Sequence, residues 1–219
     1  MIDSLAGPML GVAGVFIILA FDELFWRLRI FEGELSRKLA HIWVGTYIAI
    51  WPFFMTMEQI VVLSVAMLAV VTISRRYQIF KSIHDVKRRT YGEFFFPISI
   101  GICALLTDSK WIFMASILHL SLADGFAALA GTYFAGKTRY KIFGGYKSWV
   151  GTGTFLLLST YIIFVAVAGD IGEFASVDST IVIWLPLVAT VVEGVATYGA
   201  DDLLVPLVVT GILEAVRPG

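Results

Sequence analysis

Eight runs of apolar residues alternate with short polar stretches along the chain. A helix needs about 20 predominantly apolar residues to cross the hydrocarbon core of a bilayer, and most of the runs approach that length. The fourth and eighth runs are shorter and also fit tilted, re-entrant or internally packed helices. The pattern predicts an all-α membrane bundle of seven or eight transmembrane helices. The runs span residues 5–25, 39–55, 59–74, 93–107, 111–134, 152–169, 179–198 and 203–216.

Composition supports a membrane protein. Hydrophobic residues make up 58% of the 219 residues, and the mean hydropathy is +0.86, whereas soluble domains are about 45–50% apolar. The opening residues MIDSLAGPML carry no basic side chain, so the first run is expected to be a retained helix and not a cleaved signal. Residues 1–219 are therefore expected to form one integral-membrane domain without a soluble domain of useful size.

Basic residues gather in three of the predicted loops. Most of the 16 Lys and Arg residues lie between the first and second, third and fourth, and fifth and sixth runs. Under the positive-inside rule, this alternation places these loops and the Gly199–Asp202 loop in the cytoplasm, and both termini outside. Within the second basic loop, the apolar spacing of residues 75–92 predicts an amphipathic helix on the membrane surface.

Asp124 is an acidic residue inside the fifth apolar run. On a helix it shares a face with Ala127, Ala128 and Gly131, and such small residues allow close helix packing and admit a polar group or an ion. A carboxylate at this depth is costly unless it is paired, hydrated or bound to a metal, so intramembrane acids are functional candidates. The alternative is a structural bond to a neighbouring helix or an arginine.

Further acids lie near the end of the chain. Glu193 is in the seventh run, and Asp201 and Asp202 follow shortly after it. Mg²⁺ takes hard oxygen ligands and shares its shell with water and phosphate oxygens, so these acids together with Asp124 are candidate metal ligands. For Asp201 and Asp202, the alternative is capping of the last helix, where negative charge is favourable.

Residues 131–138, GTYFAGKT, match the phosphate-loop pattern G-x-x-x-x-G-K-[ST]. That pattern is informative only between a strand and a helix, whereas here a membrane helix precedes it and no strand or βαβ unit is predicted. We therefore reject the P-loop fold. Glycine-exposed N–H groups and a lysine still bind phosphate in other scaffolds, which leaves Gly131, Gly136 and Lys137 as candidate contacts.

The stretch KSWVGTG opens the sixth run. Ser148 or Thr152 is placed to cap the helix, whose first amide groups form an anion site. The alternative is an ordinary capped membrane helix. Lys147, Ser148 and Gly151 are therefore candidate phosphate contacts, within a cradle expected to run from Gly144 to Gly153.

Arg37 and Lys38 lie just before the second run and His41 lies near its start, and Arg37 and His41 share a helical face. They are candidates for the same site. The alternative is that the two bases anchor the helix at the cytoplasmic surface and that His41 packs at the interface.

Taken in order, five stretches resemble one family: RKLAH, RRTYGEFFFP, ADGFAALAGTYFAGK, YKSWVGT and VEGVATYGADDLLVP. They are similar to the CTP-dependent lipid-alcohol kinases, which include dolichol kinase, phytol kinase and yeast-type diacylglycerol kinase. Phosphatidate cytidylyltransferase is a more distant relative of that family. The resemblance covers about residues 34–207.

The resemblance implies transfer of the CTP γ-phosphate to a lipid hydroxyl with Mg²⁺, in a multi-helix membrane fold. Two positions depart from the family pattern: Val150 stands where a Glu is common, and Asp202 where an Asn is common. The candidate site residues, taken from their own chemistry and from the resemblance, fall into three groups. They are the catalytic candidates Asp124, Asp201, Arg37 and His41, the CTP-binding candidates Lys38, Gly131, Gly136, Lys137, Lys147, Ser148 and Gly151, and the metal ligands Asp124, Glu193, Asp201 and Asp202.

The function expected from the sequence is phosphorylation of an isoprenoid alcohol such as dolichol, another polyprenol or phytol. Diacylglycerol as acceptor, cytidylyl transfer to a lipid phosphate and a small ion-coupled transporter are the alternatives. The expected partners are CTP, the lipid alcohol and the bilayer, with the active site on the cytoplasmic face of a multi-pass protein. No nucleic acid is expected, and the sequence leaves the oligomeric state open.

Overall fold

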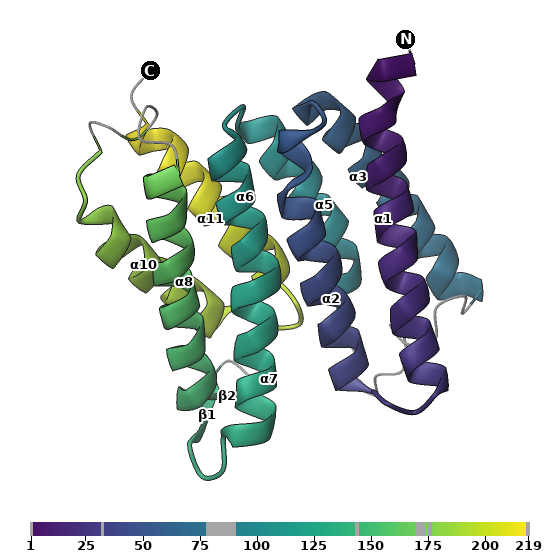
Figure 1. Cartoon of the computed structure of the whole chain (residues 1–219). Helices are drawn as coiled ribbons and strands as arrows, with labels where there is room; N and C mark the ends of the chain where they lie inside the picture. Colours follow the sequence, from purple (N-terminus) through teal and green to yellow (C-terminus); the bar gives the residue numbers. More distant parts are fainter. Residues whose placement is uncertain are drawn as a thin grey trace.

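A computed structural model describes residues 2–31, 33–77, 91–142, 145–169, 174 and 177–217. The described chain is a bundle of helices with a small hairpin at one end (Figure 1). The long helices are α1 (Ile2–Arg27), α2 (Glu34–Ala49), α3 (Met57–Tyr77), α5 (Gly92–Leu106), α6 (Lys110–Leu118), α7 (Asp124–Phe134), α8 (Trp149–Gly169), α10 (Ile181–Val195) and α11 (Asp201–Val216). The short elements are the 3₁₀ turn η1 (Trp51–Phe53), the π-helical turn η2 (His119–Ala123), and the strands β1 (Arg139–Ile142) and β2 (Gly145–Ser148).

The helical class that the apolar runs predict is confirmed, and each run corresponds to helix within a few residues. Among the described residues, four helical stretches are long and apolar enough to cross a membrane. Helices α5 and α10 are apolar but shorter, so a count of seven or eight spans stays a prediction. The four stretches are Leu5–Arg27, Met57–Tyr77, Lys110–Phe134 and Trp149–Gly169. The expected surface helix falls mainly on residues 78–90, which lie outside the described residues.

The stretch Lys110–Phe134, formed by α6, η2 and α7, is the central column of the bundle. In its most apolar 18-residue segment, 72% is buried inside the protein, whereas the corresponding segment of α1 is 11% buried. One core joins it to α8, α10 and α11 through residues such as Phe155 and Leu185, and another joins it to α2, α3 and α5 through residues such as Ile48 and Ile100. The column therefore holds the two halves of the bundle together.

Small residues let α2 approach this column closely. A Cβ atom added at Gly125 would lie 2.3 Å from Cγ1 of Ile42, and one added at Gly45 would lie 2.3 Å from Cβ of Ser121. Lipid tails are as apolar as leucine, so helices in a membrane associate through such close packing and through polar contacts. This packing holds the first turns of α2 beside the start of α7.

The π-helical turn interrupts the column just before Asp124. At its start, His119 is fully buried, and its Nδ1 lies 2.8 Å from the carbonyl oxygen of Ala115. Because Nδ1–H donates to that carbonyl, Nε2 accepts the hydroxyl of Ser159 on α8, at 2.7 Å. His119 therefore joins two helices, as expected for a structural histidine. Turns of this kind occur within α-helices and are frequent at functional sites.

The expectation that no strand occurs is wrong for residues 139–142 and 145–148. These residues pair as an antiparallel hairpin, with Arg139 opposite Ser148 and Lys141 opposite Tyr146. Helix α8 then begins at Trp149, and the hydroxyl oxygen of Ser148 accepts the N–H of Gly151 at 3.0 Å. Of the two predicted caps, Ser148 is the one used. Within the described ranges no βαβ unit occurs, which agrees with rejecting the P-loop fold.

The turn between α10 and α11 reverses the chain beside this end of the bundle. Tyr198 and Gly199 both have positive φ angles, of 57° and 88°. The carbonyl of Tyr198 accepts the N–H of Tyr91 at 3.1 Å, which ties the turn to the start of α5. The reversal brings the first residues of α11 next to the last residues of α10.

Candidate active site

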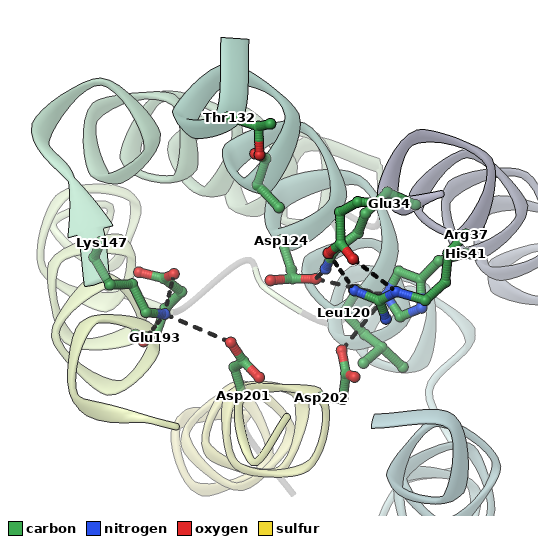
Figure 2. A network of polar contacts seen from close by, with 12 residues as sticks. Glu34, Arg37, His41, Leu120, Asp124, Thr132, Lys147, Glu193, Asp201 and Asp202 are labelled. Atoms are coloured by element: carbon green, nitrogen blue, oxygen red, sulfur yellow. Dashed lines mark hydrogen bonds and ion pairs between the residues drawn. The ribbon is translucent and has the colours of Figure 1, made fainter. Parts of the chain in front are cut away.

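Charged side chains from five elements converge at one end of the bundle. Figure 2 shows Asp124 at the centre, with Lys147 and Glu193 on one side, His41 on the other, and the two acids of α11 below. Asp124, Glu193 and Asp202 are buried, with exposed fractions of 6%, 5% and 5%. Buried carboxylates need cations or hydrogen bonds, so the partners of each acid show what the site is built to hold.

Asp124 is the first residue of α7 and follows the π-helical turn directly. The ammonium group of Lys38, on α2, donates to its Oδ2 atom, and the side chains of both residues are more than nine-tenths buried. Nε2 of His41 lies 3.7 Å from the same oxygen. The close packing of α2 on α7 therefore brings two of the predicted N-terminal residues to Asp124.

His41 is held by the backbone of the π-helical turn. Its Nε2 lies 2.7 Å from the carbonyl oxygen of Leu120, so Nε2–H donates to that oxygen. The same nitrogen is 3.5 Å from Oδ1 of Asp202, and the ring lies against Phe96 with centroids 4.8 Å apart. His41 is thus placed between two acids. The Leu120 carbonyl is a partner that sequence reasoning missed, because a backbone acceptor in a π turn has no side-chain pattern.

Lys147 extends from β2 to the opposite side of Asp124. Its ammonium group donates to Oε1 of Glu193 and, at 2.5 Å, to the backbone carbonyl of the same residue. Oδ2 of Asp201 lies 3.5 Å away. Burial by itself lowers the pKa of Lys147, but the carboxylates of Glu193 and Asp201 outweigh that effect and raise the pKa above its ordinary value. Lys147 is therefore a positive charge at neutral pH.

The adjacent acids of α11 point to different sides of Asp124. Successive residues on a helix are rotated by about 100°, so Asp201 faces Lys147 while Asp202 faces His41, as Figure 2 shows. Both lie in the first turn of α11, where negative charge is favourable. Asp202, the acid that departs from the family pattern, thus belongs to the His41 side of the site.

The acids form two groups that fit a divalent cation. One group is Asp124, Glu193 and Asp201, and the other is His41, Asp124 and Asp202; in each, the possible ligand atoms lie within 4.8 Å of one another. Among the described residues, Glu193 Oε2 and Asp202 Oδ1 are buried without a hydrogen-bond partner. Mg²⁺ prefers oxygen ligands, so the all-carboxylate group fits it better, and Asp124 belongs to both groups.

Arg37 lies on the edge of this cluster. Its guanidinium group donates to Glu34 at 2.5 Å, three residues earlier on α2. Glu34 is a partner to which the sequence reading assigned no role. The pairing holds Arg37 beside the His41 side of the site, as Figure 2 shows.

Three of the predicted phosphate contacts lie in the interface between α7 and α8. A Cβ atom at Gly131 would lie 2.8 Å from Oγ of Ser148, and one at Gly151 would lie 2.8 Å from the carbonyl oxygen of Ala127. Ser148 is buried and caps α8. Close helix packing and capping therefore explain why these three residues lie here. They affect the acids only indirectly, because they position the strand that carries Lys147.

The structure does not bring Gly136 and Lys137 into the acid cluster. Both are exposed after the end of α7, where Gly136 takes a left-handed φ of 48° that ends the helix. Lys137 makes no ion pair with any residue in the described part of the chain. The predicted cradle from Gly144 to Gly153 is instead strand β2 and the first turn of α8, with Gly144 outside the described residues.

Comparison with known proteins gives one informative relative. No protein-family model matches the chain, and no solved structure matches it. The chain is 30% identical over 203 residues to a phytol kinase from Synechocystis sp., an alignment that covers 90% of this chain and 86% of the relative. The chain therefore belongs to the CTP-dependent lipid-alcohol kinase family that its motifs resemble.

Proposed function

We propose that the protein transfers the γ-phosphate of CTP to the hydroxyl of an isoprenoid alcohol in the membrane, such as phytol, dolichol or another polyprenol. One observation carries the proposal: three carboxylates from α7, α10 and α11 meet two lysines at one end of an apolar bundle. Phosphoryl transfer needs positioning and neutralisation of charge more than covalent help from the protein. The likeness to a phytol kinase favours an isoprenoid acceptor.

In this proposal Asp124, Glu193 and Asp201 hold Mg²⁺, with Asp202 completing the acid set. The ion would neutralise charge on the CTP phosphates. The buried Oε2 atom of Glu193, which has no hydrogen-bond partner among the described residues, supports this assignment. Lys38 and Lys147 already lie against these acids, so either ammonium group can contact phosphate oxygens that share the ion.

In the chemical step, the lipid hydroxyl oxygen bonds to the γ-phosphorus while the bond to the bridging oxygen breaks. CDP leaves with that electron pair, and a carboxylate takes the hydroxyl proton. We assign the proton acceptor to Asp201, because Asp124 already receives the ammonium of Lys38 and the Asp201 side chain is 19% exposed, against 9% for Asp124. Arg37 and His41 would hold the acids on the opposite side in place.

The remaining CTP-binding candidates take supporting places in the same proposal. Gly136 and Lys137 would contact the nucleotide from the outer edge of the site, where both are exposed. Gly131, Ser148 and Gly151 would hold β2 and α8 against α7 so that Lys147 reaches the acids.

We also propose that the site end of the bundle faces the cytoplasm, in a protein with seven or eight spans. The positive-inside pattern of the loops and the cytoplasmic location of CTP support that orientation. The acceptor's hydroxyl would then reach Asp201 from the membrane surface while its tail lies between helices in the bilayer.

The test is phosphate transfer by the purified full-length protein in lipid nanodiscs. With CTP labelled at the γ-phosphate, Mg²⁺ and phytol, dolichol or diacylglycerol, we expect a labelled lipid monophosphate from the isoprenoid alcohols. ATP, GTP and UTP in place of CTP should give much less product. In a separate sample with a lipid phosphate as acceptor, pyrophosphate release with CMP joined to the lipid would mean cytidylyl transfer. Ion flux without nucleotide binding would mean transport.

A further inference from the structure

The β1–β2 hairpin has two faces that differ in their surroundings. Residues paired across an antiparallel hairpin place their side chains on the same face. Tyr140 pairs with Lys147, and these two form the inner face. Lys141 pairs with Tyr146 and Arg139 pairs with Ser148, so these four residues share the outer face. Ser148 is buried where the strand meets α8, and the open part of the face is Arg139, Lys141 and Tyr146.

The contacts of the inner face fix the orientation of the hairpin. Lys147 reaches Glu193, as described above. The hydroxyl of Tyr140 is 2.8 Å from Oγ1 of Thr152, and its ring lies 4.9 Å from the ring of Trp149. The outer face must therefore point away from the acid cluster.

The outer face is basic and open. Arg139 and Lys141 are exposed, and Tyr146 between them is 74% exposed. Neither cation forms an ion pair with any residue of the described chain, although the molecule carries 17 acidic and 16 basic residues overall. Two unneutralised cations side by side attract an anionic partner.

The position of the hairpin identifies that partner as a lipid surface. The hairpin connects the ends of two of the membrane-length stretches, α6–α7 and α8 (Figure 1). Large aromatic side chains are exposed at both of these ends: Tyr133 by 60%, Phe134 by 74% and Trp149 by 68%. Exposed aromatic residues at the ends of spans mark the headgroup level of a bilayer, so Arg139 and Lys141 lie only a few residues beyond it.

We propose that the outer face of the hairpin, Arg139, Lys141 and Tyr146, binds the headgroups of anionic lipids. The two cations contact the lipid phosphates, and the ring of Tyr146 lies among the headgroups. An anionic leaflet then holds the hairpin at the membrane surface, while its inner face keeps Lys147 in the acid cluster. The proposal concerns residues that the proposed transfer reaction does not use, so either one can fail without the other.

The experiment measures which lipids surround the hairpin in the full-length protein. A fluorophore is attached to the cysteine of the Tyr146→Cys variant. The native Cys103 is fully buried, so it does not compete for the label. The protein is reconstituted in phosphatidylcholine vesicles that contain either brominated phosphatidylglycerol or brominated phosphatidylcholine at the same fraction. Stronger quenching by the anionic lipid gives its relative association constant at the hairpin.

We expect phosphatidylglycerol to be preferred at low salt. In the double variant Arg139→Gln/Lys141→Gln, the relative association constant of the anionic lipid should fall about fivefold for each cation removed. High salt should also remove the preference in the labelled protein that keeps Arg139 and Lys141. The matched control is Lys110→Gln at the other end of the α6–α7 column, which should leave the preference at residue 146 unchanged. Unchanged thermal unfolding of each variant shows that the fold is intact.

Equal quenching by the two lipids in the labelled protein with Arg139 and Lys141 intact would overturn the proposal, as would a preference that survives the double substitution. Inorganic phosphate and CTP are added in separate samples. If either one abolishes the preference at constant ionic strength, the outer face binds a soluble phosphate and the lipid assignment is wrong. If neither does, the anionic lipid is the ligand.

Discussion

The two sides of Asp124 carry similar charges but are built differently. On the α2 side, Lys38 and His41 come from a helix packed tightly on the central column, and the side chains of Lys38 and Asp124 are 7% and 9% exposed. On the hairpin side, Lys147 comes from a short strand, and the side chains of Lys147 and Asp201 are both 19% exposed. One side is set by helix packing. The other depends on a hairpin lysine that pairs with the buried Glu193 and lies beside the more exposed Asp201.

The largest expected effect comes from Asp124, which belongs to both sides. Asp124→Asn should lower the transfer rate by at least about 10²-fold, because it removes the carboxylate shared by the two candidate metal groups. It also leaves Lys38 buried without its anion. The double variant Asp124→Asn/Lys38→Met should therefore regain stability but not activity. A near-normal rate for either variant in the labelled-CTP assay would show that Asp124 is not a metal ligand.

Substituting each lysine in turn tests directly whether the two sides of Asp124 differ in stability and in nucleotide binding. Lys38→Met leaves a buried carboxylate unpaired and should lower the free energy of unfolding by about 3–5 kcal/mol. Lys147→Met removes the cation of the buried Glu193, but water reaches the 19% exposed Lys147 position, so the cost should be lower, at about 1–3 kcal/mol. Its main effect should be a higher KM for CTP.

Denaturant unfolding in one detergent and steady-state kinetics in nanodiscs measure these quantities. Equal losses of stability with an unchanged KM for Lys147→Met would contradict the difference between the two sides.

The close approach of α2 can be disturbed without touching a charge. Gly125→Ala places a Cβ atom against Ile42 and should cost about 1–3 kcal/mol, with reduced activity as α2 shifts away from Asp124. Gly211→Ala on α11 is the matched control, because no atom lies within 4 Å of the added Cβ. Unfolding curves for the two variants give the difference. If both lose the same stability, tight packing is not what positions the α2 side.

The smallest expected effect is on the cap of α8. Ser148→Ala removes the acceptor for the N–H of Gly151 and should cost about 1 kcal/mol. The KM for CTP should rise slightly, since β2 carries Lys147. Thr154→Ala is the control, because the Thr154 hydroxyl only donates to the Val150 carbonyl within the same helix. A larger loss for Thr154→Ala than for Ser148→Ala would rule out the capping role.

Much of the site was accessible from residue chemistry alone. Asp124 and Glu193 stand out because ionised groups are rare inside apolar runs, whatever the fold around them. Helix positions followed from the length of those runs, since a membrane helix satisfies its own backbone. The order of the motifs indicated the family, which the likeness to a phytol kinase then showed.

The hairpin was missed because four-residue strands between two membrane helices leave too short an alternation to recognise. Gly131 matched a phosphate-binding pattern by letter and Gly151 was a candidate phosphate contact, yet both lie where two helices touch. A glycine in a sequence indicates a close approach of some kind, but only the neighbouring element shows whether a helix or a ligand makes that approach.

By itself, the sequence determined the membrane class, the family and which acids and lysines are candidates, because these depend on local composition and order. Only the tertiary structure decided how they combine. It placed Asp201 and Asp202 on opposite sides of Asp124, bound His41 to the Leu120 carbonyl, and left Lys137 outside the cluster. The reason is geometric: these outcomes depend on the rotation of helices distant in sequence, and on a π-helical turn that a periodic pattern does not reveal.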